Sequence, residues 1–435
     1  MEKVFNWGMY PQIEANQFSS GNYGKIADFV KTKDVIIARG NGRCYGDSSL
    51  QKKIFSTLSL NKIIAFDEKL GILNCEAGVL LSEILNLIVP KGFFLPVTPG
   101  TKFITIGGAV ASNIHGKNHH KEGAIAAYIQ SFELMIETGE IVHCSEKNNT
   151  VLFANTIGGM GLTGIILSVQ IRLKKIETSY INQSTIKAKN IKEIITYFEN
   201  YKNTTYTVAW INCLAKGNHL GQSILYLGEH AKIDELNKKQ SENPLKTHHK
   251  TPINIPFYFP TFVLNSTFIK LFNFLFYHKQ LRQKATKIID YNSFFYPLDA
   301  LNNWNKMYGK NGFTQYQFVI PFENGKVVLI EILTQISDSG CSAFLAVLKT
   351  FGPKDVHSSP LSFPMEGYTL AVDFKVNKKV FQLLDQLDEI VLKYGGRLYL
   401  TKDARMTANT FAKSYHESLV HLAKFSSLQS ERLGI

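Results

Sequence analysis

Residues 99–120 read PGTKFITIGGAVASNIHGKNHH, and this stretch decides the expected fold. A Pro-Gly turn and a β-branched run lead into Gly107-Gly108, and small residues then precede His115-Gly116-Lys117. Side chains are absent or small where the backbone would have to approach a large, flat ligand closely. We expect the segment to lie along a cofactor and to bring His115 and Lys117 to its reactive end.

The alternative interpretation of this stretch is a Gly-rich structural loop that carries a surface histidine cluster. A zinc site built from His115, His119 and His120 is disfavoured. His115 and His119 have the spacing of one helical turn, but Gly116 stands where a metalloprotease helix needs Glu, and glycine is a poor helix former. No metal is expected.

The composition is that of an ordinary globular protein, and its excess of positive charge favours an anionic partner. The 435 residues are 45% hydrophobic, which suffices for two domains, and the formal net charge is +13. Lys and Arg are dispersed, so a nucleic-acid partner is not expected. The five cysteines form no C-x-x-C pair and the N-terminus lacks a signal-peptide pattern, which favours reduced thiols in the cytoplasm.

Short strands interleaved with helices predict an α+β flavin-type domain over residues 1–175, and a second, strand-rich domain opens at 176. A hairpin is expected at 129–143. Further strands are expected at 34–39, 71–78, 165–176, 207–214, 316–321 and 368–376, and helices at 80–92 and 381–396.

Residues 254–277 (NIPFYFPTFVLNSTFIKLFNFLFY) are unusually aromatic, with Lys270 as the only charge. The length would suit a membrane span, but Pro, Asn and Lys interrupt the run. Two interpretations stay open: a buried core segment, or an apolar flap that contacts lipid beside Lys279, Arg282 and Lys284.

Two glycine motifs differ in what they indicate. RGNGRCYGD (39–47) follows a predicted strand, and its backbone N–H groups and arginines can cradle a pyrophosphate. Gly159-x-Gly161-x-x-Gly164 matches the dinucleotide fingerprint, but it opens a strand rather than a helix. NAD binding is therefore not expected, while the interpretation as a tight turn that contacts a cofactor stays open.

These segments resemble flavoproteins of the vanillyl-alcohol-oxidase type, and most closely those members that oxidise the ribose of a polyprenylphosphoryl sugar. The resemblance runs nearly from end to end. Its further strings are GLTGII (161–166), PLDALNNWN (297–305), GFTQYQFVIP (312–321), FGP (351–353), PLSFP (360–364), VDF (372–374) and GGRLYLTKDAR (395–405).

The resemblance implies a two-domain α+β fold. An FAD-binding domain would occupy 1–175 and an antiparallel-sheet substrate domain 176–394, in which 254–284 would be a mobile, lipid-facing segment. The C-terminal segment 395–435 would return to the FAD domain.

The resemblance also assigns site residues. Lys402 is the expected base, Lys117 would hold the substrate or stabilise charge on reduced flavin, and His115 would join them at the reaction centre. Expected at the FAD pyrophosphate are Arg39, Gly40, Asn41, Gly42, Arg43, Cys44, Tyr45, Gly46, Asp47 and Ser48. Expected along the flavin are Gly100, Thr105, Ile106, Gly107, Gly108, Ser112, Asn113, Ile114, His115, Ile166 and Tyr399. Expected at the substrate are Tyr45, Gln315, Gln317, Lys349, Phe295, Thr369 and Ala371.

The chain departs from the family pattern at several positions. Members that bind flavin covalently carry a histidine where this chain has Arg43-Cys44, so FAD is expected to be non-covalent. Ala371 stands where mycobacterial members have an active-site Cys, Thr369 where they have Asn, and Phe295 where they have Tyr. These changes bear on lipid or sugar specificity rather than on oxidation.

The implied function is FAD-dependent oxidation of the 2′-hydroxyl of a polyprenylphosphoryl-β-D-ribose to the 2′-keto sugar. A separate NAD(P)H-dependent short-chain reductase would complete epimerisation to the arabinose donor, at a peripheral, cytoplasmic membrane surface. The alternative is an FAD-dependent oxidase of a free sugar, alditol or aldonolactone. Retention of Gln315, Gln317 and Lys349 argues against that alternative.

Overall fold

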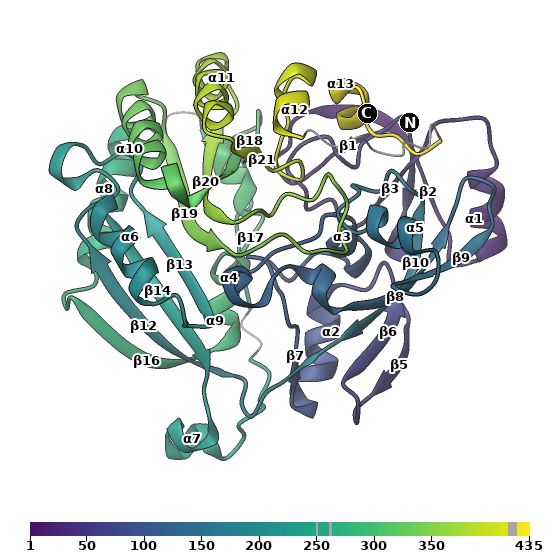
Figure 1. The fold of residues 1–435 in the computed structure, drawn as a ribbon, viewed down its shortest axis with the longest axis horizontal. Helices are drawn as coiled ribbons and strands as arrows, with labels where there is room; N and C mark the ends of the chain where they lie inside the picture. Colours follow the sequence, from purple (N-terminus) through teal and green to yellow (C-terminus); the bar gives the residue numbers. More distant parts are fainter. Residues whose placement is uncertain (249–250, 261–262, 416–423) are drawn as a thin grey trace.

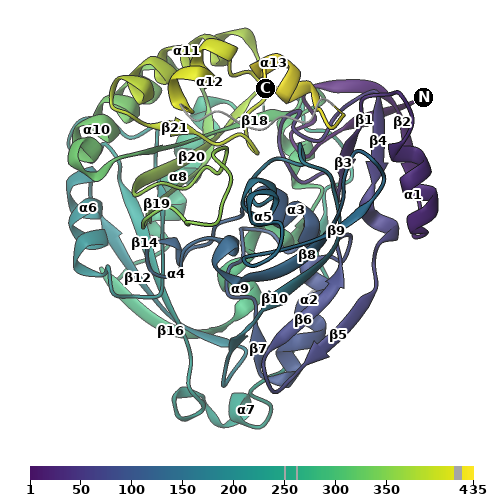
Figure 2. The ribbon, with the colours of Figure 1, turned by 45° about the vertical axis from the view of Figure 1, so that its right-hand side comes forward.

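A computed structural model describes residues 1–248, 251–260, 263–415 and 424–435. The chain folds into two mixed regions of helix and sheet that face each other across a central helix, α3 (Ile106–Ala111), as Figures 1 and 2 both show. The α+β class predicted from the sequence is confirmed. The predicted strands, hairpin and helices all occur, with ends shifted by a few residues.

The N-terminal region contains a four-stranded sheet in the order β1-β2-β4-β3 and a five-stranded antiparallel sheet in the order β5-β6-β10-β8-β9. Its strands are β1 (Glu2–Phe5), β2 (Gln12–Ser19), β3 (Ile37–Arg39), β4 (Lys53–Ser56), β5 (Ile63–Asp67), β6 (Ile72–Glu76), β8 (Ile129–Met135), β9 (Ile141–Ser145) and β10 (Ile165–Arg172). Its main helices are α1 (Tyr23–Val30), α2 (Leu81–Ile88), α3 and α5 (Thr150–Thr156).

Apolar spacing explains why these elements form. In α2, Leu81, Ile84, Leu85 and Ile88 recur at helical intervals and are all buried in the core of the five-stranded sheet. The glycine motif before β10 forms a turn in which Gly158, Gly161 and Gly164 all have positive φ. The motif thus opens a strand, as predicted, and not the helix of a dinucleotide-binding unit.

The second region is built on an eight-stranded antiparallel sheet in the order β16-β12-β14-β13-β19-β20-β18-β21. Its strands are β12 (Tyr180–Ala188), β13 (Tyr206–Ile211), β14 (Ser223–His230), β16 (Lys284–Asp290), β18 (Phe313–Ile320), β19 (Ala343–Phe351), β20 (Gly367–Lys375) and β21 (Arg397–Leu398). Helices α6 (Ile191–Asn200), α10 (Phe322–Ser339) and α11 (Lys378–Lys393) cover its outer face (Figure 1).

The alternation of strand side chains assigns the two faces of this sheet. In β18, Tyr316 and Phe318 are buried in the same core cluster as the apolar residues of α10 and α11. Gln315 and Gln317 therefore point to the inner face, toward the N-terminal region. The inner face is where the polar site residues of this region gather.

The C-terminal elements lie against the N-terminal region. Phe425 bridges to Ile36, and the Leu428 N–H donates to the Leu50 carbonyl at 2.8 Å. Helices α12 (Ala408–Ser414) and α13 (Leu428–Leu433) follow β21, and α13 lies near β1 and the N-terminus (Figure 1). The domain boundaries at 175 and 394 stay predictions; residues 416–423 lie outside the described residues.

The aromatic segment at 254–284 contains one longer helix, α8 (Ser266–His278). Ile269, Asn273 and Tyr277 are buried, whereas Phe268, Leu271, Phe274 and Leu275 are 46 to 59% exposed. The helix is therefore neither wholly core nor wholly free. Of the helices that the structure describes, none is both long and apolar enough to cross a membrane. Residues 261–262 of this segment lie outside the described residues.

Candidate functional site

The loop after β3 forms one wall of a cavity and depends on its glycines. A Cβ at Gly40 would stand 2.2 Å from Thr105 Oγ1, and one at Gly46 would stand 1.7 Å from the Asp403 carbonyl oxygen. Gly42 has a φ of +60°, which favours glycine. The loop therefore packs closely against the segments of Thr105 and Asp403, and a side chain at Gly40 or Gly46 would prevent this contact.

Residues of the segment 99–120 form the second wall of the cavity. Thr105 caps α3, since its Oγ1 accepts from the Gly108 N–H at 3.2 Å. A Cβ at Gly107 would come within 2.8 Å of Ala77 Cβ, so α3 lies close against β6. Nothing lies within 4 Å of a Cβ placed on Gly100, which lines the open cavity.

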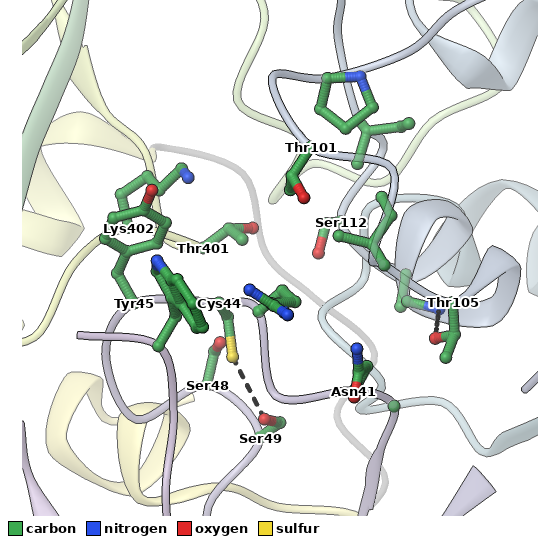
Figure 3. A pocket seen from close by; sticks show the side chains of 18 of the residues that line it. Asn41, Cys44, Tyr45, Ser48, Ser49, Thr101, Thr105, Ser112, Thr401 and Lys402 are labelled. Carbon is green, nitrogen blue, oxygen red and sulfur yellow. Dashed lines mark hydrogen bonds between the residues drawn. The ribbon is translucent and has the colours of Figure 1, made fainter. Parts of the chain in front are cut away.

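The cavity has a volume of about 320 Å³ and runs from the glycine loops to the inner face of the eight-stranded sheet. Figure 3 shows Asn41, Ser112 and Thr105 on one side and Tyr45 with Lys402 on the other. The predicted residues that line it are Gly40, Asn41, Gly42, Arg43, Cys44, Tyr45, Ser48, Gly100, Thr105, Gly107, Gly108, Ser112, Ile114, His115, Ile166, Gln315, Gln317, Lys349, Ala371, Tyr399 and Lys402.

Eight other predicted site residues lie behind the cavity wall. Arg39 donates to Asn6 Oδ1 at 3.2 Å and to the Phe5 carbonyl at 2.9 Å, so it braces the loop. The Asn113 amide bonds Ser362 Oγ at 2.8 Å, and Thr369 Oγ1 accepts from Gln317. The full set outside the lining is Arg39, Gly46, Asp47, Ile106, Asn113, Lys117, Phe295 and Thr369.

Three lysines near the sheet are partly buried and electrostatically linked. The pKa of Lys117 is lowered to about 7, mainly by burial and further by the charge of Lys349. The pKa of Lys349 is also lowered to about 7, mainly by burial and further by the charge of Lys402. Burial also lowers the pKa of Lys402, and the carboxylate of Asp373 partly opposes this. Among the described residues, none of the three lysines forms an ion pair with a carboxylate.

His115 is held as a neutral imidazole. Burial, and then the charges of Lys349, His119 and Lys402, lower its pKa well below the ordinary value. Its Nε2 lies 3.2 Å from the Gln317 amide nitrogen, which can only donate, so Nδ1 carries the proton. Within the described part of the chain, Nδ1 has no hydrogen-bond partner. A free donor is therefore left in a residue that lines the cavity.

Lys117 is the predicted catalytic residue that lies furthest from the expected placement. Its ammonium donates to the Phe294 carbonyl and lies 4.4 Å from the centre of the Phe294 ring and 5.5 Å from that of Phe295. It does not line the cavity. Its direct contact with a ligand therefore stays a prediction.

Sequence reasoning missed several residues at the site. Asp373, two residues beyond Ala371, accepts from the Gln315 amide at 2.5 Å and from the Tyr308 hydroxyl at 3.3 Å. The quoted string VDF contained it, but no local pattern marked it as functional. The residues that line the cavity without having been assigned to the site include Trp7, Thr101, Met160, Leu298, Asp299, Trp304, Val347 and Thr401, and the turn glycines Gly161 and Gly164 line it as well.

The residues present fit FAD. Glycine-lined walls permit close approach of a flat ring, while Arg43 and the hydroxyls of Ser48, Ser49 and Thr101 suit a pyrophosphate. The unpartnered Nδ1–H of His115, a residue that lines the cavity, adds a donor. Among the described residues, no group of His, Cys, Asp or Glu side chains is arranged to hold a metal ion.

The sequence of this chain is similar to those of known proteins. A family model described as FAD binding domain matches residues 24–145. The decaprenylphosphoryl-beta-D-ribose oxidase of Mycolicibacterium smegmatis is 36% identical over 385 residues, covering 87% of this chain and 83% of the relative. An uncharacterized protein in the mprA 5′ region of Streptomyces coelicolor is 28% identical over 75% of this chain and 90% of its own.

A D-lactate dehydrogenase of Anaerostipes hadrus is 29% identical over a shorter stretch, covering 33% of this chain and 31% of its own. The stretch of 385 residues shared with the mycobacterial oxidase includes most of both regions of the fold. The two-domain flavoprotein architecture, the FAD cofactor and an oxidoreductase activity on a CH–OH group are thereby confirmed. The chain belongs to the decaprenylphosphoryl-β-D-ribose oxidase family of FAD-dependent oxidoreductases.

Proposed function

We propose that this protein oxidises the 2′-hydroxyl of a polyprenylphosphoryl-β-D-ribose to the 2′-keto sugar. The observation that carries the proposal is that two lysines, Lys349 and Lys402, line the cavity, and that neither forms an ion pair with a carboxylate among the described residues. Positive charges held away from water are costly unless an opposite charge compensates them, and in the described part of the chain the carboxylate that acts on Lys402 is that of Asp373. The phosphodiester of such a substrate would supply the missing anion.

FAD, when bound, supplies the hydride acceptor for oxidation of the alcohol carbon. Lys402, in its neutral form, accepts the hydroxyl proton at Nζ, so that the carbonyl can form as the C–H bond breaks. The low pKa that burial imposes on Lys402 keeps part of this residue neutral near pH 7. Gln315 and Gln317 offer amide groups that orient the sugar hydroxyls, and His115 offers its Nδ1–H.

Apolar side chains continue from the cavity along the same sheet face. Trp210 of β13 pairs directly with Val347 of β19, which lines the cavity, and paired residues share a face. The Trp210 ring lies 4.7 Å from that of Phe276 in α8. We propose that the polyprenyl chain leaves the cavity past Val347 and Trp210 and reaches the exposed apolar side of α8.

We further propose that α8 docks the enzyme peripherally on an anionic, cytoplasmic membrane surface. Exposed Leu271 and Leu275 could enter the lipid while Lys279, Arg282 and Lys284, also exposed, meet the headgroups. The keto product would pass to a separate NAD(P)H-dependent short-chain reductase, because inversion at C2′ requires re-addition of hydride from the opposite face. The pair of reactions would make an arabinose donor for the cell wall.

Anaerobic mixing with a substrate panel tests the proposal. The panel contains polyprenylphosphoryl-ribose of two chain lengths, free ribose, an alditol and an aldonolactone, and the 2′-deoxy analogue serves as a control that cannot be oxidised. We expect rapid loss of flavin absorbance with the phosphoryl-riboses and none with the 2′-deoxy compound. Faster reduction by the free sugar, alditol or aldonolactone would support the alternative oxidase instead.

A further inference from the structure

We propose that Arg432, in the last helix, is a positioning residue that holds the Lys402 loop against the loop that cradles the FAD pyrophosphate. The inference rests on the proposed role of Lys402 as base. If Arg432 has this role, helix α13 contributes to the geometry of the active site although it lies far from the glycine loops in the sequence. Nothing in the local sequence of α13 marks it as such.

The guanidinium of Arg432 joins the two loops through their acidic residues. Nε and Nη2 donate to the two carboxylate oxygens of Asp47 at 3.1 and 2.8 Å, and Nη2 also donates to Asp403 Oδ2 at 2.9 Å. Nη1 donates to the Met406 carbonyl. Asp47 ends the glycine loop and Asp403 directly follows Lys402, so one side chain holds both segments.

The two loops also touch each other directly. The Tyr45 N–H donates to the Thr401 carbonyl at 3.0 Å, and Gly46 leaves no room for a Cβ against the Asp403 carbonyl. Figure 3 shows the result, with the Lys402 side chain beside the Tyr45 ring. The position of Lys402 in the cavity therefore depends on how closely these loops are held.

Arg432 is needed because the loops would otherwise repel. The side chains of Asp47 and Asp403 are only 6% and 8% exposed, and the Asp403 charge contributes to raising the pKa of Asp47, after burial as the main cause. A planar guanidinium can satisfy both carboxylates at once, which the point charge of a lysine cannot do with the same geometry. Loss of Arg432 leaves two nearly buried like charges face to face.

A double-mutant cycle on the FAD-loaded protein tests the inference. Arg432→Gln is measured alone and in a Lys402→Ala background, and the readout is the anaerobic rate of flavin reduction at saturating substrate. In the wild-type background we expect a loss of roughly 10- to 100-fold, since small misplacements of a catalytic group have effects of this size. In the Lys402→Ala background we expect the same substitution to change the rate by less than about 2-fold.

Two outcomes are informative in opposite ways. If the two rate losses multiply, Arg432 acts independently of Lys402 and the inference is overturned. If Lys402→Ala alone leaves the reduction rate unchanged, the proposed base role fails instead, whatever Arg432 does. The failure of the inference and that of the proposed function are thus distinguished.

Control variants separate positioning from general destabilisation. Glu431→Gln alters the neighbouring residue of α13, whose carboxylate accepts from the Gln51 amide, and should leave reduction unchanged. Arg432→Lys should restore only part of the rate. If Arg432→Gln fails to fold or to keep FAD, Asp403→Asn repeats the cycle, because it removes the charge on the Lys402 side while leaving the bonds from Arg432 to Asp47. Multiplying effects in that cycle would equally overturn the inference.

Discussion

The ammonium of Lys402 lies 3.6 Å from the centre of the Tyr45 ring, so that a residue near the C-terminus and one in the glycine loop meet at one end of the cavity. The Tyr45 ring is itself held edge-on against Phe313 at 5.1 Å. The aromatic face orients the lysine but does not remove its proton, since a cation above a ring is favoured. The contact therefore fixes position, while burial and neighbouring charges decide the protonation state.

Replacing Lys402 should separate cofactor binding from chemistry. Lys402→Ala is expected to keep FAD, because the glycine loops remain, but to slow flavin reduction by on the order of 10²-fold or more. Stopped-flow absorbance under anaerobic conditions measures the rate, and Lys413→Ala, at an exposed position nearby in the chain, is the control. Unchanged reduction in the Lys402 variant would remove it from the mechanism.

The pH dependence of reduction should report the pair Lys402 and Asp373. Reduction requires neutral Lys402, so the rate should rise with pH through the lowered pKa of this residue. The charged or titratable groups that act on it are Asp373, Cys44, Lys349 and His115, with Tyr45 in contact. Because the Asp373 carboxylate favours the protonated lysine, Asp373→Asn should move the rising limb to lower pH, by about one unit.

The control for that shift is Asp385→Asn, which removes the same charge from an exposed helix position. We expect its pH profile to match that of the wild type. A rising limb that stays in place in Asp373→Asn, or moves to higher pH, would show that Asp373 does not set the protonation of Lys402.

The flavin should be released by acid. The family resemblance implies that Arg43 and Cys44 stand where covalent members carry the histidine that links flavin, and the Arg43 guanidinium lies 3.9 Å over the Trp7 ring. Acid precipitation should therefore leave the yellow colour in the supernatant. Colour retained in the pellet would contradict this expectation. If the pellet of Cys44→Ser then lost its colour, the Cys44 thiol, which lines the cavity, would be identified as the attachment point.

The exposed side of α8 can be tested without removing the helix, which is anchored by the bond from the Asn273 amide to Asn212 Oδ1 at 2.8 Å. The variant Leu271→Ser/Leu275→Ser should bind anionic vesicles more weakly and raise the KM for long-chain substrates more than for short-chain ones. Both residues are more than half exposed, so Tm should hardly change. Val327→Ser, at a 60% exposed position on α10, is the matched control. Equal effects on both chain lengths would refute the lipid route.

The cofactor class and the cavity walls could be predicted from the sequence because their requirement is local. Gly40, Gly42 and Gly107 mark places where a side chain would collide or the backbone is left-handed, and such constraints follow from residues that are close together in the sequence. The strand predicted at 316–321 contained Gln317, and the structure extends it as β18 back to Phe313, so that Gln315 and Gln317 share a face. The family resemblance assigned Lys349 and Lys402 to the site, and both line the cavity.

Arg39 and Lys117 show the limit of that reasoning, because their side chains turn away from the cavity to bond Asn6 and the Phe294 carbonyl, and no sequence interval encodes that choice.

Only the tertiary structure decided which charges meet. Asp47 and Arg432 are 385 positions apart, yet they share a bidentate ion pair, and Asp373 reaches Lys402 from another strand. Burial and Coulomb interactions depend on distance in space, so the pKa values and the positioning of Lys402 could not be obtained from the order of residues alone.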